Sequence, residues 1–113
     1  MRGVSTCLAV GLLWVGCGGP QPDTTPATHD DFRAIQRHEA TMDGAAPVAE
    51  DLDAECELRC SAAANVCEAA RGICRIAEDT ADLDVRARCR RAQSTCQRAT
   101  HATGTGDGCE CSP

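Results

Sequence analysis

The chain has 113 residues and two aromatic ones, Trp14 and Phe32, so it can hold one small domain but not a core of large apolar side chains. Its ten cysteines predict disulfide staples, which form in an oxidising compartment outside the cytoplasm. The net charge of −6 argues against nucleic acid as a partner.

Residues 1–16 have the pattern of an export signal. Arg2 precedes the apolar run 4–15, which is too short for an ordinary membrane span. The residues that end this run read LWVGC and resemble the lipobox of bacterial lipoproteins. That resemblance implies removal of the leader and acylation of Cys17, which would anchor the chain in a membrane. Gly18 after it resembles the sorting pattern of outer-membrane lipoproteins that face the periplasm or the cell surface.

The number of cysteines bears on this interpretation. Cys7 leaves with the leader, and acylation of Cys17 then leaves eight of the ten cysteines, an even number for pairing. Plain secretion with cleavage near Gly18 or Gly19 is the alternative. Cleavage that kept Cys17 as a free thiol would leave one cysteine without a partner.

Residues 17–29 are predicted to be a tether between the anchor and a folded domain. Three prolines among polar residues favour an extended and solvated chain.

The segment 30–48 predicts a short amphipathic helix and a linker. The helix covers 30–42 and has Phe32, Ile35 and Met42 on one face. We expect Asp30 or Asp31 to cap it and the residues from Asp43 to Pro47 to end it. Such a helix packs on the rest of the domain or docks on another envelope protein.

Residues 49–113 predict an all-α antiparallel hairpin with a glycine-rich tail. Cysteines recur every seven residues in a first helix over 49–77 and in a second over 81–102, so each helix carries sulfur on one face. Alanine fills most of the other seam positions and lets the helices approach closely enough for disulfides. The architecture resembles other cysteine-stapled helical hairpins, a resemblance that carries no residue roles.

One antiparallel register about a turn at 78–81 brings two cysteine pairs opposite each other, because both pairs of residue numbers have the same sum. The same register brings the tail beside the start of the first helix, where the crossed pairing of its two cysteines stays open. The expected bonds are Cys74–Cys89, Cys67–Cys96, Cys60–Cys109 and Cys56–Cys111.

Five arginines of the second helix form a candidate binding surface: Arg86, Arg88, Arg90, Arg91 and Arg98. We expect them to pair with Asp82, Asp84 and acids of the first hairpin helix. The alternative is a site for an anionic surface or a partner.

The sequence predicts a non-catalytic cell-envelope lipoprotein with a structural or interaction role and no cofactor. The alternative is a thiolate site for zinc or copper built from Cys56, Cys60, Cys109 and Cys111. The oxidising location favours disulfides over that site. We expect the three histidines, which are scattered along the chain, to be solvated rather than catalytic.

Overall fold

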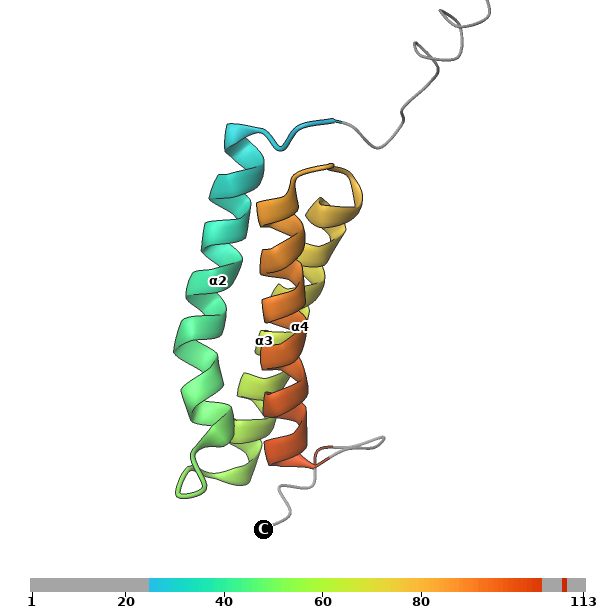
Figure 1. Cartoon of the computed structure of the whole chain (residues 1–113). Helices are drawn as coiled ribbons and strands as arrows, with labels where there is room; N and C mark the ends of the chain where they lie inside the picture. The colour runs from blue at the N-terminus through green and yellow to red at the C-terminus, as the bar shows by residue number, and fades with distance from the viewer. Residues whose placement is uncertain (1–24, 105–108, 110–113) are drawn as a thin grey trace, which may run out of the picture.

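The computed structural model describes residues 25–104 and Cys109. This part of the chain contains the helices α2 (His29–Glu50), α3 (Cys56–Glu78) and α4 (Leu83–Thr103) and no strand. The three helices lie side by side with their chain directions alternating, so that α2 and α4 run the same way and α3 runs against both (Figure 1). The predicted all-α class, a stapled antiparallel hairpin with a helix before it, is therefore confirmed.

The hairpin seam is lined by small side chains at the expected positions. The buried residues that alternate with cysteine along it are Ala63, Ala70, Ala77, Val85, Ala92 and Ala99. The side chain of Asp82 accepts hydrogen bonds from the backbone N–H groups of Asp84 and Val85, at 2.8 and 3.3 Å. This cap fixes the start of α4 two residues later than predicted.

The helix before the hairpin is longer than predicted. α2 runs on to Glu50, so the expected break over 43–47 is wrong. Its N-cap is Thr28, whose hydroxyl accepts from the N–H of Asp31 at 3.1 Å while the Asp31 carboxylate accepts from the N–H of Thr28 at 2.8 Å. This reciprocal capping box replaces the expected cap at Asp30 or Asp31 itself.

Pro47 lies inside α2 and does not end it. A proline in a helix interior costs about 3 kcal/mol because it removes a backbone donor. The residues just after it pack on the hairpin: Val48 is partly buried and Ala49 is fully buried. Burial of this last turn offsets the loss, so tertiary packing overrides the local signal.

The core lies on the common axis of the three helices. Ile35 of α2, Val66 and Ile73 of α3 and Val85 of α4 are all fully buried there. α2 thus supplies part of the only aliphatic core that the described residues contain, and its apolar face is occupied by the hairpin.

Arg59 joins the ends of two helices. Its spacing of four residues from Glu55 would predict an ion pair on a solvated face, but the residue is 4% exposed. Its Nε donates to the backbone oxygen of Ala49 at 3.2 Å and its Nη2 donates to that of Ala102 at 2.7 Å. Both carbonyls belong to C-terminal turns, where the helix dipole attracts a cation. The guanidinium therefore fastens α2 and α4 to the beginning of α3.

The described chain begins beside the α3–α4 turn. The backbone oxygen of Thr25 accepts from the N–H of Ala81 at 3.1 Å, and Ala27 packs against the core. The chain therefore enters the bundle at the turn end (Figure 1). The predicted leader, Cys17 and most of the predicted tether lie outside the described residues.

Candidate functional site

Two disulfides join α3 to α4 as rungs. Cys74 and Cys89 form the turn-side rung, with Cα atoms 4.7 Å apart, and Cys67 and Cys96 form the middle rung with the same separation. These are the pairs that the predicted register brings together. Their regular spacing along the seam fixes the hairpin covalently in one register.

A third bond ties the tail to the far end of the hairpin. Cys60 and Cys109 form this end rung, with Cα atoms 5.6 Å apart. The sulfur of Cys56 lies 4.0 Å from that of Cys60, and Cys56 is itself disulfide-bonded. Its expected partner, Cys111, lies outside the described residues.

The sulfur atoms at this end are three of the four predicted metal ligands, namely Cys56, Cys60 and Cys109. Within the described ranges no group of three or more ligating side chains is arranged to hold a metal ion. Two of the three sulfurs are bonded to each other, so a thiolate site here would require reduction of the end rung.

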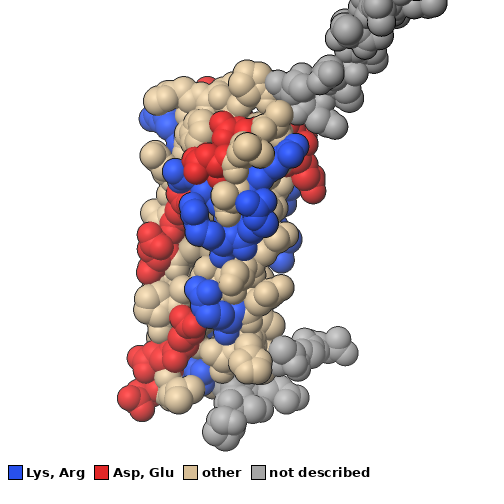
Figure 2. Space-filling model, in the orientation of Figure 1, with Lys and Arg blue, Asp and Glu red and all other residues tan. Residues whose placement is uncertain are grey.

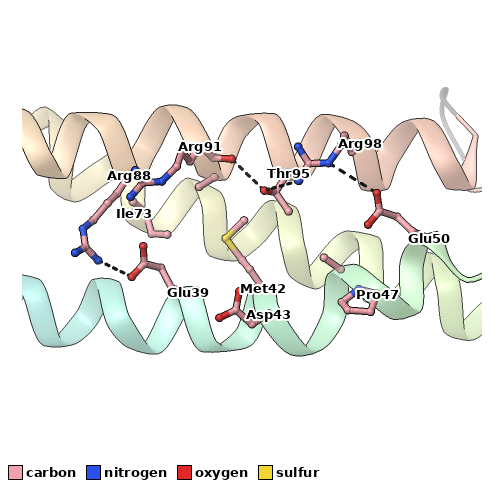
Figure 3. A pocket seen from close by; sticks show the side chains of 12 residues that line it. Glu39, Met42, Asp43, Pro47, Glu50, Ile73, Arg88, Arg91, Thr95 and Arg98 are labelled. Atoms are coloured by element: carbon pink, nitrogen blue, oxygen red, sulfur yellow. Dashed lines mark hydrogen bonds and ion pairs between the residues drawn. The ribbon is translucent and has the colours of Figure 1, made fainter.

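A groove runs between α2 and α4 (Figure 3). Of the three pairs of helices in the bundle, these two are the least closely packed. Its volume is about 530 Å³. Met42, Ile73 and Ala92 contribute apolar surface to it. Acidic side chains of α2 and basic side chains of α4 also line it: Glu39, Asp43, Glu50, Arg88, Arg91 and Arg98. The groove therefore combines an apolar surface with two rims of opposite charge.

Ion pairs close the groove at both ends. Arg88 bonds Glu39 at 2.7 Å across the groove and Asp84 at 2.9 Å within α4. The hydrogen bond that Arg88 donates to Asp84, with the charge of Glu39, raises the pKa of the Arg88 guanidinium. Arg98 lies 3.8 Å from Glu50.

These pairs correct part of the sequence interpretation. The acids that cross to the arginines of α4 come from α2, whereas we expected them from α3. Asp84 pairs as predicted, but Asp82 is used as the cap of α4. The sequence did not indicate the groove, because the predicted helix ended at residue 42, before four of the six lining residues that α2 contributes.

Between the ion pairs the groove keeps exposed charge. Arg91 and Asp43 are exposed on opposite rims, and neither takes part in an ion pair within the described residues. A segment that brings an apolar side chain together with charges of both signs would match this surface.

The histidines are spread over the bundle. His29 and His101 are exposed, and His38 of α2 is half-buried against Gly72 of α3. Two of the three histidines are thus solvated as expected, while the third packs at a helix contact.

No known protein family, curated protein or solved structure matches the chain. Among the described helices, none is long and apolar enough to cross a membrane.

Proposed function

We propose that this protein is an exported lipoprotein, anchored through Cys17, whose helical bundle serves a non-catalytic interaction role at a membrane surface of the cell envelope. The observation that carries the proposal is the set of disulfide rungs along the hairpin. Such bonds persist in oxidising compartments, and the lipobox-like leader would deliver the chain to one.

The interaction role is supported by the groove between α2 and α4. Its rims of opposite charge and its apolar residues suit a partner segment of mixed character. Cross-links in the hairpin and an aliphatic core under α2 hold the two rims in place, so little ordering is required when a partner binds.

The anchor is tested by the mass of the protein from its native membrane. We expect acyl chains on an N-terminal Cys17, recovery in the membrane fraction, and loss of both in a Cys17→Ser variant. A soluble mature chain that begins at another residue would contradict the anchor.

The interaction role is tested by capture of partners from solubilised envelope. Arg91→Glu reverses a charge on the groove, and Arg33→Glu makes the same change on an exposed residue of α2 that does not line it. We expect a partner that is lost with Arg91→Glu and retained with Arg33→Glu. Equal capture by both variants would contradict a role for the groove.

Thiolate binding of zinc or copper(I) is the second candidate, because three predicted ligands do meet at one end: Cys56, Cys60 and Cys109. The intact mass of the mature protein separates the two proposals. A mass lower by eight hydrogens than that of the reduced chain would favour full pairing of its eight cysteines. A full complement of thiols with bound metal would favour the metal site.

A further inference from the structure

The turn-side rung is surrounded by four arginines in a repeated pattern. In both helices an arginine stands three residues before the rung's cysteine and another directly after it. We call these residues the arginine face: Arg71, Arg75, Arg86 and Arg90. All four are exposed.

The four side chains lie on one side of the hairpin. An α-helix turns about 100° per residue. The residue three positions before a cysteine and the residue directly after it are therefore rotated from that cysteine in the same direction around the helix axis, by roughly 60° and 100°. Two antiparallel helices joined at equivalent residues are related by a local two-fold axis, so both pairs are turned toward the same face. Arg88 and Arg98 contact α2 from the opposite side of α4. The arginine face is therefore turned away from α2.

The arginines of the arginine face form no ion pair within the described residues, unlike Arg88 and Arg98 beside the groove. Within the described residues all ion pairs of α4 use Arg88 or Arg98. Among the residues that the structure describes, the arginine face donates one hydrogen bond, from Arg86 to the backbone oxygen of Thr80, at 3.5 Å. Four guanidinium groups thus remain available to an external anion, and guanidinium matches phosphate in geometry.

The charge is specific to this end of the hairpin. At the middle rung the four equivalent positions hold Ala64, Glu68, Gln93 and Gln97, with one negative charge and no positive one. The opposite end of the bundle is acidic, with carboxylates at Asp51, Asp53, Glu55 and Glu57. Figure 2 shows arginine gathered over the half of α4 nearer the α3–α4 turn.

An exposed leucine accompanies the arginine face. Leu83, the first residue of α4, is 76% exposed. It precedes Arg86 by three residues and Arg90 by seven, so it lies on the same stripe of the helix. An apolar side chain beside arginines suits the boundary between lipid head groups and acyl chains.

The arginine face also lies at the end from which the tether leads to the proposed anchor, since Thr25 is bonded to Ala81 in the turn. Carboxylates lie at the same end and weaken its positive field: Glu78, Asp79, Asp82 and Asp84 around the turn, and Asp30 and Asp31 at the start of α2. We propose that the arginine face and Leu83 bind the anionic phosphate head groups of the membrane that holds the lipid anchor. The bundle would then rest with the end opposite the α3–α4 turn directed away from that membrane. This inference rests on the proposed anchoring at Cys17.

The test uses the full acylated protein with Leu83→Trp. Removal of the leader takes Trp14 with it, so the introduced indole is the one tryptophan of the mature chain. The protein is inserted into vesicles of phosphatidylcholine, with either brominated phosphatidylcholine or brominated phosphatidylglycerol as the quencher. We expect quenching by the anionic lipid alone and its loss at high salt.

Paired substitutions identify the face. Each basic side chain near an anionic surface strengthens binding roughly fivefold. Arg86→Gln with Arg90→Gln should therefore lower the equilibrium constant for the quenched state about 25-fold. Arg33→Gln with Arg37→Gln makes the same change in net charge on α2 and should leave that constant almost unchanged.

Equal quenching by both brominated lipids, or an equal loss in both double variants, would overturn the inference. Failure of the protein to float with neutral vesicles would overturn the anchor instead. In that case the protein is added to anionic vesicles from solution, where the same two double variants still decide whether the arginine face binds them.

Discussion

The bundle contains two kinds of helix interface. α3 and α4 meet through alanines and disulfide rungs, whereas α2, which has no cysteine, meets the hairpin through aliphatic side chains and two ion pairs. Alanines permit the close approach that a disulfide needs but bury little apolar surface. The covalent bonds therefore provide at one interface what Ile35 and Met42 provide at the other. The hairpin should keep its register when α2 is released, because only α2 is held without covalent bonds.

Removal of both inter-helix rungs should have the largest effect. We expect replacement of Cys67, Cys74, Cys89 and Cys96 by alanine to cost roughly 2–4 kcal/mol for each bond, since each restricts the unfolded chain. Such a loss approaches the whole stability of a small domain. Thermal unfolding followed by far-UV circular dichroism measures it. An unchanged melting temperature would show that the rungs are not needed.

Ile35→Ala tests the interface that has no covalent bonds. Ile35 is fully buried, and truncation of such a side chain costs about 2–5 kcal/mol. Hydrogen exchange should show loss of protection in α2 first, with α3 and α4 still protected by their rungs. Leu83→Ala, at a site that is 76% exposed, is the control and should change stability by less than about 0.5 kcal/mol. Simultaneous loss of protection in all three helices would contradict the difference between the interfaces.

Arg59→Met tests the contact where the two interfaces meet. It leaves the carbonyl oxygens of Ala49 and Ala102 without their donor, which should cost about 1–3 kcal/mol. Arg75→Met, at an exposed site of the same helix, is the matched control. Chemical denaturation of both variants measures the difference. Equal stability of the two variants would mean that Arg59 does not fasten the helix ends.

The hairpin could be predicted from the sequence because its restraints are the positions of cysteine and alanine, which can be counted along the chain. A seven-residue recurrence of cysteine in both arms, with the turn at 78–81, leaves one antiparallel register, and the alanines between the cysteines agree with it. Few other arrangements satisfy both conditions. The expected pairs at the two inter-helix rungs and the pair at the end rung are the ones at bonding distance in the structure.

The C-terminal half of α2 and the groove could not be predicted in the same way. Gly44 and Pro47 are local signals for a break, and the packing of Ala49 that overrides them comes from residues distant in the sequence. Arg59 likewise has a nearby acid at helical spacing, yet its partners are the carbonyls of two other helix ends. Burial decides both cases. It depends on packing between residues that are distant in the sequence, and no spacing pattern along the chain indicates it.

The smallest predicted effect concerns the contact between α2 and α3 at Gly72. A Cβ atom there would lie 2.5 Å from Nε2 of His38, so an alanine must displace the imidazole. Alanine in place of a helical glycine gains about 1 kcal/mol, which the displaced ring should cancel. Gly72→Ala should therefore be nearly neutral alone and stabilising by about 1 kcal/mol when combined with His38→Ala.

Gly44→Ala is the matched control for this cycle, since nothing lies within 4 Å of a Cβ atom at that position of α2. It should stabilise the protein by about 1 kcal/mol whether or not His38 is present. Denaturant unfolding of the single and double variants measures both coupling energies. A coupling near zero between Gly72 and His38 would mean that α2 adjusts freely over α3, as expected of an interface without covalent bonds. A coupling of about 1 kcal/mol would mean that α2, although not cross-linked, is held at a fixed distance from α3 at this contact.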